Sequence, residues 1–172
     1  RDSVASRGLG DVYKRQKPAC HTSQFADCTR EEIVNAYDNT IAYTDHILAE
    51  AIRLLDRHQE LATNLFFVSD HGESLGENGL FLHGAPYFMA PDTQTHVPMI
   101  AWFSPSYAAL VGLDQGCVRN LADAPLSHDN VFHTMLGLSE VSTSAYQPAL
   151  DMFATCRGRA GGALAQLPEQ RS

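Results

Sequence analysis

An Asp and a His stand next to each other at the end of an apolar run, and their types are suited to metal chemistry. Residues 64–68 read NLFFV, and residues 69–79 follow as SDHGESLGENG. Neighbouring side chains of a strand point to opposite faces, so Asp70 and His71 converge on one ion only where the strand breaks, and Gly72 permits that break. A carboxylate oxygen and an imidazole nitrogen are ordinary zinc ligands. The sequence therefore predicts a metal site with Asp70 and His71 as ligands.

More groups that can bind metal or donate hydrogen bonds follow in the same loop, namely Glu73, Ser74, Glu77, Asn78 and then His83 in GLFLHGAPY. The imidazole of His83 would bind metal or donate to a phosphoryl oxygen. The alternatives are a turn in which Asp70 caps the next segment beside a surface His71, and a core His83 bonded to a carbonyl. The number of ligand-type groups in one loop favours the metal interpretation.

The remaining histidines carry weaker signals. His96 precedes the second predicted strand, and metal binding and support of the loop are equally compatible with that position. His128 and Asp129 fit the first turn of a helix, where polar residues gather for electrostatic reasons. Solvated or packed structural roles are expected for His21, His46, His58 and His133.

The elements that must position this loop are predicted from periodicity. A capping box at Thr29 and Glu32 starts a helix that runs to about His58. Its apolar stripe consists of Ile33, Tyr37, Ile41, Thr44, Leu48, Ala51 and Leu55. Strands are expected at 64–68 and 97–103, separated by a long irregular loop over 72–96. A short helix should follow from an N-cap at Ser127 to Leu138, with Val131, Met135 and Leu138 facing inward.

This order predicts an α/β fold. The continuous apolar strand at 64–68 is typical of a strand covered on both faces, which indicates part of an α/β/α sandwich with a mostly parallel sheet. Residues 1–16 are expected to be a disordered leader of doubtful origin and residues 157–172 a disordered tail, which leaves 17–156 as the folded part. The first residue is Arg rather than Met, so we expect a piece of a larger protein.

Composition excludes some functions. With a net charge of -8 and a pI near 5.3, no basic patch for nucleic acid is expected. No apolar stretch approaches the roughly 18 residues needed to span a bilayer. We therefore expect any membrane anchor to lie outside this sequence.

The four cysteines, Cys20, Cys28, Cys117 and Cys156, form an even set without a C-x-x-C pair. They allow two disulfides in an oxidising compartment, and Cys20 and Cys28 close a short loop suited to a disulfide. Four buried free thiols are the alternative.

The sequence resembles a known enzyme family over residues 17–156. The matching segments are the run from Tyr37-Asp-Asn-Thr to Thr44-Asp45, SDHGESLGENGLFLHGAPYFMAP and THVPMIAWFSP. They resemble the soluble catalytic domain of phosphoethanolamine-lipid A transferases, the group that includes the colistin-resistance enzymes. The segment 69–91 is more specific than the Asp-His-Gly shared by the wider alkaline phosphatase and sulfatase superfamily. The Cys20–Cys28 loop also looks like one of that family's disulfides.

The resemblance implies a zinc enzyme at the periplasmic face of the bacterial inner membrane. It implies transfer of phosphoethanolamine from phosphatidylethanolamine to a lipid A phosphate through a Thr-linked intermediate. Asp70 and His71 become zinc ligands, and His83 becomes a catalytic phosphoryl contact or a ligand of a second metal. Glu73 has a hypothetical role in binding the substrate ammonium.

The chain departs from the family pattern in one respect. The family's nucleophilic Thr, its Glu and His ligands and its transmembrane domain would precede residue 17, and none is recognisable in this sequence. We therefore expect the 172-residue chain to be inactive alone. The alternatives are another sulfatase-superfamily hydrolase or phosphoglycerol transferase, and a non-catalytic disulfide-bonded domain with a structural metal site.

Overall fold

The computed structural model describes residues 16–158, which form two compact units. The first comprises the chain up to Arg57 together with Leu65–Trp102, and the second comprises His58–Asn64 together with the chain from Phe103 onward. Residues 1–15 of the expected leader and residues 159–172 of the expected tail lie outside the described residues.

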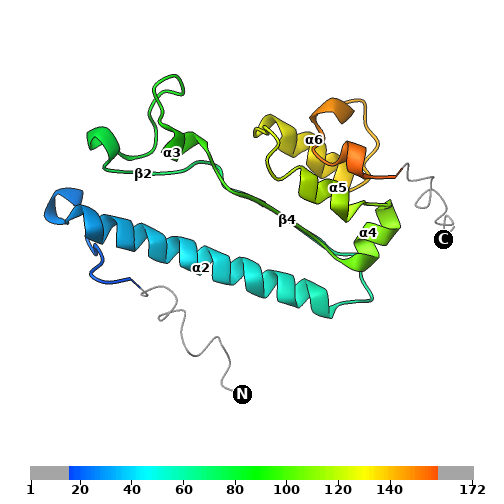
Figure 1. The fold of residues 1–172 in the computed structure, drawn as a ribbon, viewed down its shortest axis with the longest axis horizontal. Coiled ribbons are helices and arrows are strands. Elements are labelled where there is room, and N and C mark those ends of the chain that lie inside the picture. The colour runs from blue at the N-terminus through cyan, green and yellow to red at the C-terminus, as the bar shows by residue number, and fades with distance from the viewer. Residues whose placement is uncertain (1–15, 159–172) are drawn as a thin grey trace, which may run out of the picture. The chain divides into compact units, whose positions relative to one another are not determined.

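A long helix dominates the first unit. After a short 3-10 turn, η1 (Phe25–Asp27), comes helix α2 (Arg30–Arg57), as Figure 1 shows. The predicted capping box is present, because the Thr29 N–H donates to Glu32 Oε2 at 2.7 Å and the Glu32 N–H donates to Thr29 Oγ1 at 3.2 Å. The amide of Thr29 holds the pKa of the Glu32 carboxyl below its usual value. The start of the helix was therefore predicted correctly.

The apolar stripe of α2 is covered only in part. Ile33 is buried, whereas Ile41 is half exposed, and the other predicted members are partly buried. The predicted stripe is therefore exposed at Ile41. Asn39, a polar residue outside the stripe, is buried because its side-chain amide exchanges two hydrogen bonds with the backbone of Gln16.

Two five-residue strands pair, β1 (Asn64–Val68) and β4 (Met99–Phe103). The Ser69 N–H donates to the Pro98 carbonyl, and the Ser104 N–H donates to the Thr63 carbonyl. The end of each strand thus lies beside the start of the other, so this pair is antiparallel. The α/β class is as expected, and these two strands run antiparallel where a mostly parallel sheet was expected. A parallel pair needs a crossover connection, usually a long helix, and the segment between these strands contains none.

The segment that joins the strands is more ordered than predicted. It contains a small antiparallel hairpin of β2 (Ser74–Leu75) and β3 (Phe81–Leu82) around η2 (Glu77–Gly79), followed by α3 (Asp92–Thr95). Strand β1 is half-buried along its whole length. The expectation that it is covered on both faces is therefore not met by the described residues.

The second unit contains most of the fully buried apolar side chains. Its helices are α4 (Pro105–Val111), α5 (Gln115–Asn120) and α6 (Asp129–Leu138), followed by the 3-10 turns η3 (Pro148–Leu150) and η4 (Ala154–Cys156). Its core includes Phe103, Tyr107, Val111, Leu113, Leu138, Met152 and Phe153. A disulfide joins Cys117 to Cys156 in this unit, and the first unit holds the Cys20–Cys28 disulfide, so both pairs of cysteines are bridged.

Details at the two ends of α6 differ from the prediction. The N-cap residue is His128 rather than Ser127, and Met135 is 45% exposed rather than inward. Leu138 is buried as expected, and His133 is a packed histidine whose Nδ1 accepts the Gln147 N–H. The inward face of a ten-residue helix is decided by neighbours far away in the sequence, which periodicity does not reveal.

Arg157, assigned to the disordered tail by the sequence, belongs to the second unit. It forms an isolated antiparallel bridge with Leu113, and its guanidinium pairs with the fully buried carboxylate of Asp151. The Tyr146 hydroxyl also donates to that carboxylate at 2.6 Å. Burial, followed by this hydrogen bond, raises the pKa of Tyr146. The folded part therefore continues at least to residue 158.

Candidate functional site

The loop after β1 gathers three side chains that can bind a metal. The ligand atoms of His71, Glu73 and His83 all lie within 4.8 Å of one another. The rings of His71 and His83 lie against each other, with centroids 3.7 Å apart and planes tilted by 35°. This three-residue cluster lies within the first unit, and it contains three of the four residues proposed from the sequence for metal or substrate contact, namely His71, Glu73 and His83.

Hydrogen bonds orient both imidazoles. His71 Nδ1 is 3.0 Å from the Gly72 carbonyl oxygen, and His83 Nδ1 is 2.7 Å from Glu73 Oε1. Because a carbonyl or carboxylate oxygen only accepts, each Nδ1 carries the proton that it donates, which leaves the Nε2 of each ring to face a ligand. The site is thus arranged to offer two imidazole nitrogens.

Asp70 lies next to this cluster without being a member of it. Its Oδ1 accepts the His71 backbone N–H at 3.0 Å, its Oδ2 is 3.6 Å from His71 Nε2, and its side chain is 87% exposed. The His71 amide is the main reason that the pKa of the Asp70 carboxyl is lowered. Asp70 is therefore charged and close to the free nitrogen of His71, and its assignment as a metal ligand stays a prediction.

Glu73 is the most enclosed charged group of the cluster. One carboxylate oxygen holds His83, while the other, Oε2, is buried and has no hydrogen-bond partner within residues 16–158. A buried carboxylate oxygen without a donor is costly, and a cation would stabilise it. Tyr37 on α2 also belongs to these surroundings, because burial and then the charge of Glu73 raise the pKa of Tyr37; no signal in the sequence near Tyr37 pointed to this role.

Gly72 and the short hairpin fix the loop that carries the cluster. The Gly72 N–H donates to the Gln94 carbonyl, and a Cβ at Gly72 would lie 2.1 Å from the Thr93 carbonyl oxygen. Ser74 is almost fully buried and accepts a hydrogen bond from Gln94 Nε2. Strand β1 ends at Val68, before Gly72, and the absence of a side chain at Gly72 permits a close contact with the backbone of α3.

The N-terminus of α2 supports the hairpin from its other side. Arg30 lies 3.4 Å from both the Leu75 carbonyl oxygen and Glu77 Oε1. Phe25, between the bridged Cys20 and Cys28, contacts the ring of Phe81 with centroids 5.9 Å apart. Glu77 was grouped with the ligand candidates, but its Oε2 accepts the Leu75 N–H at 2.6 Å, which is a structural role.

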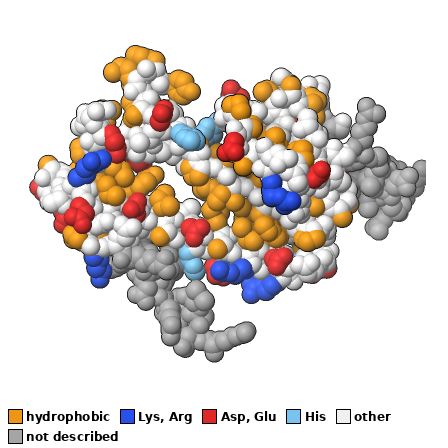
Figure 2. Space-filling model, in the orientation of Figure 1, with side chains coloured by type: hydrophobic (Ala, Val, Ile, Leu, Met, Phe, Trp, Pro, Cys, Tyr) orange, Lys and Arg blue, Asp and Glu red, His pale blue; other side chains and the backbone are white. Residues whose placement is uncertain are grey.

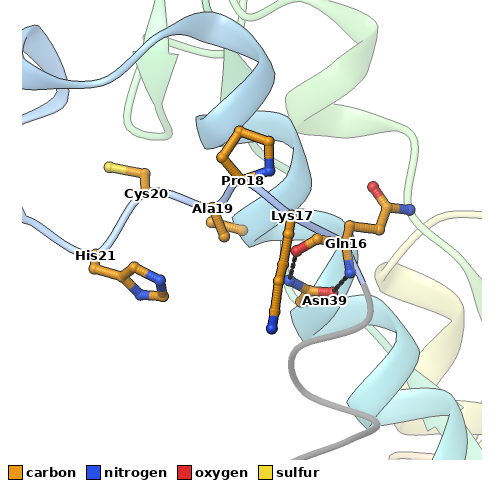
Figure 3. Close-up of a pocket in the computed structure, with 8 residues that line it drawn as sticks. Gln16, Lys17, Pro18, Ala19, Cys20, His21 and Asn39 are labelled. Atoms are coloured by element: carbon orange, nitrogen blue, oxygen red, sulfur yellow. Dashed lines mark hydrogen bonds between the residues drawn. The ribbon is translucent and has the colours of Figure 1, made fainter.

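The other candidates have structural positions. The His96 backbone N–H caps α3 by donating to the Asp92 carbonyl, and His96 is outside the cluster. A pocket of about 260 Å³ lies between residues 16–21 and α2 (Figure 3), where Gln16 and Asn39 are joined by two hydrogen bonds. No member of the cluster lines this pocket.

No helix within residues 16–158 is both long enough and apolar enough to cross a bilayer.

Known proteins similar to this chain share its fold and much of its sequence. The chain is 48% identical over 147 residues to phosphoethanolamine transferase EptA of Salmonella typhimurium, which covers 84% of this chain and 27% of that protein. It is 36% identical to phosphatidylethanolamine transferase Mcr-1 of Escherichia coli, over 77% of this chain and 23% of that protein. The chain thus spans about a quarter of the length of these relatives.

A solved structure shows the same fold. The soluble domain of lipooligosaccharide phosphoethanolamine transferase A from Neisseria meningitidis superposes with a TM-score of 0.82 at 41% identity, covering 86% of this chain and 45% of that one. Residues 5–141 match the sulfatase family. The chain therefore belongs to the sulfatase family, and its similarity to solved structures extends over part of the catalytic domain of phosphoethanolamine transferases.

Proposed function

We propose that the complete protein is a zinc-dependent transferase that moves phosphoethanolamine from phosphatidylethanolamine onto a phosphate of lipid A. The proposal is supported by the names of the relatives and by the position of the cluster His71, Glu73 and His83 at the end of β1. One further relative is a Kdo(2)-lipid A phosphoethanolamine 7''-transferase of Salmonella typhimurium, 37% identical over 97 residues. A solved relative is an integral membrane protein, which agrees with our proposed location at the periplasmic face of the inner membrane.

The donor set suits zinc. His71 offers Nε2 as a nitrogen ligand. Asp70 and Glu73, in the same loop, each offer a carboxylate oxygen. The buried Oε2 of Glu73, which has no hydrogen-bond partner among residues 16–158, supports a positive charge at this place. Asp70 and His71 would hold the ion. When bound, zinc supplies a Lewis acid that lowers the pKa of a nucleophile and balances phosphoryl charge.

The other residues of the cluster have separate tasks. His83 keeps its Nδ1 proton on Glu73, and its Nε2 would contact a phosphoryl oxygen, as a donor when the ring is protonated. Glu73, which is the carboxylate next to His83, would interact with the ammonium group of ethanolamine. The attacking Thr, which would carry phosphoethanolamine in the intermediate, would come from a part of the protein that this chain does not contain.

The exposure of the cluster favours an enzyme over a structural metal site. A structural zinc site is closed by four protein ligands. Here the side chain of His83 is 50% exposed and that of Asp70 is 87% exposed, so at least one side of the cluster is open to a substrate. Among the described residues the cluster supplies three ligands rather than four.

The proposed function is tested with the complete protein in a bacterial strain that lacks this modification. We expect lipid A to gain the mass of a phosphoethanolamine group, and we expect the Asp70→Asn and His71→Gln variants, produced at equal level, to lose the gain. Unmodified lipid A from the wild-type protein would refute the proposal. A gain of phosphoglycerol instead would favour a related transferase.

We further propose that the 172-residue chain alone is inactive, because an incomplete ligand set cannot hold the ion tightly. Incubation with fluorescent phosphatidylethanolamine and lipid A should give no labelled product. Turnover by the isolated chain would contradict this statement.

A further inference from the structure

The loop between β3 and α3 exposes the three most exposed large apolar side chains of residues 16–158. Tyr87 is 88% exposed, Phe88 is 84% exposed and Met89 is 65% exposed. Figure 2 shows hydrophobic side chains covering the tip of this loop, which protrudes in Figure 1 beside α3. Such a cluster on the surface indicates contact with a partner or a membrane.

The loop holds these side chains in a defined turn. The N–H groups of Met89 and Ala90 both donate to the Pro86 carbonyl, at 2.8 and 2.9 Å. Pro86 and Pro91 enclose the tip and restrict the backbone at both ends. The exposure of three consecutive apolar side chains is therefore a consequence of a formed turn.

The charge pattern selects the kind of partner. Residues 79–91, GLFLHGAPYFMAP, contain no Asp, Glu, Lys or Arg, whereas the chain as a whole has a net charge of -8. Aromatic side chains such as Tyr and Phe bind well at the boundary between headgroups and acyl chains. An uncharged aromatic tip on an acidic chain fits a lipid surface better than a charged protein surface.

The tip is also close in sequence to the candidate site. Tyr87 follows His83 by four residues, and four extended residues span at most about 14 Å. This reach is comparable to the depth of a headgroup layer, about 5 to 10 Å. A tip embedded in the membrane would hold His83 near the level of a lipid phosphate.

We propose that Tyr87, Phe88 and Met89 form a lipid-contact tip that inserts into the interface of the bilayer and holds the loop of His83 at headgroup level. This inference rests on the proposed function, because only a lipid substrate requires the site to be at that level. The second unit supplies a matched control, since Phe132 and Met135 are 56% and 45% exposed.

The test uses the 172-residue chain and neutral vesicles of phosphatidylcholine and phosphatidylethanolamine, which do not repel an acidic chain. We expect Phe88→Ser with Met89→Ser to weaken vesicle co-sedimentation at least about fivefold, and Phe132→Ser with Met135→Ser to leave it within about twofold. Raising the salt concentration should change wild-type binding less than twofold, because no charge is involved. Equal loss in both double variants, or no vesicle binding by the wild type, would overturn the proposal.

A second variant places a reporter in the tip without removing its apolar character. Phe88→Trp should be quenched by lipids brominated near the headgroup, whereas Phe132→Trp should not, with Trp102 present in both. Equal quenching would overturn the proposal, as would a shift in sedimentation that shows the tip joining two copies of the chain.

The two proposals fail in distinguishable ways. The vesicle experiments do not require turnover, so the tip is refuted by loss of selectivity between the variants even when the complete protein modifies lipid A. Unmodified lipid A together with tip-dependent vesicle binding would refute the transfer reaction and retain the lipid contact.

Discussion

Glu73 Oε1 lies 2.7 Å from His83 Nδ1 and thereby orients a histidine ten residues further along the chain. Glu73 immediately precedes β2 and His83 immediately follows β3. Because Ser74 pairs with Leu82, the hairpin brings the two residues together. A second pair of the same types, His58 and Glu60, is 2.8 Å apart on the surface of the other unit. The second oxygen of Glu73 is buried without a donor within residues 16–158, which distinguishes the two pairs.

Replacement of Glu73 should therefore weaken metal binding. Glu73→Gln keeps the shape of the side chain but removes the charge that stabilises a cation and orients His83. We expect the affinity for zinc to fall about tenfold or more, measured by calorimetry on the folded chain. Glu60→Gln is the matched control and should leave the affinity unchanged. Similar losses in both variants would show that the Glu73 pair has no special relation to the metal.

Gly72 should tolerate no side chain. The added Cβ of Gly72→Ala would lie 2.1 Å from the Thr93 carbonyl oxygen, so the loop or α3 must move. We expect a loss of about 2 kcal/mol or more in the free energy of unfolding by urea, together with weaker zinc binding.

Gly79→Ala separates this steric effect from backbone strain. Gly79 has a φ of 76°, and nothing lies within 4 Å of an added Cβ, so only the cost of the left-handed conformation remains, about 1 kcal/mol. A larger loss at Gly79 than at Gly72 would contradict the contact with Thr93.

The sequence predicted those features that depend on neighbouring residues. The capping box at Thr29 and Glu32 and the strand at 64–68 each follow from residue types within a few positions. Helix α4 also has local start and stop signals of this kind in its sequence. Ser104 caps it through the Tyr107 N–H, Pro105 occupies its first turn, and Gly112 ends it with a φ of 62°.

Features that depend on distant parts of the chain were not predictable in this way. The antiparallel orientation of β1 and β4 depends on how thirty intervening residues fold back. The pairing of Glu73 with His83, and the approach of Tyr37 to Glu73, depend on the hairpin and on the packing of α2. The sequence identified His71, Glu73 and His83 separately, whereas their assembly into one cluster required the structure.

The carboxyl of Glu77 should make the stability of the first unit depend on pH. Its own backbone amide and that of Leu75, and then Arg30, lower the pKa of Glu77 from 4.5 in the folded state. The charged form is thus favoured by folding, so its contribution is present above pH 4.5 and is lost as the pH falls through the folded value. Because the side chain is about one-third exposed, we expect this contribution to be below about 1 kcal/mol.

Comparison of Glu77→Gln with the wild type isolates this contribution. The difference between their unfolding free energies in urea should shrink as the pH is lowered below 4.5. Glu50→Gln, which removes the surface pair with Arg53 on α2, is the control and should show a smaller change. A difference that grows at low pH would show that the sign is wrong.

The two disulfides should stabilise the chain to different extents. Cys117 and Cys156 are 39 positions apart, whereas Cys20 and Cys28 are 8 apart. Cross-linking a longer loop removes more entropy from the unfolded chain, about 4 kcal/mol for the longer and about 2.5 kcal/mol for the shorter. We therefore expect Cys117→Ser with Cys156→Ser to lower the urea midpoint more than Cys20→Ser with Cys28→Ser.

For zinc affinity, the Cys20–Cys28 disulfide should matter more than the Cys117–Cys156 disulfide. The Cys20–Cys28 loop carries Phe25, which packs on Phe81 of the hairpin between Glu73 and His83. Loss of this disulfide should weaken zinc binding several-fold, whereas loss of Cys117–Cys156, in the other unit, should leave it almost unchanged while the chain is folded. Calorimetry in non-denaturing buffer measures both variants. Weakening by the Cys117–Cys156 variant alone would contradict the support of the hairpin by Phe25.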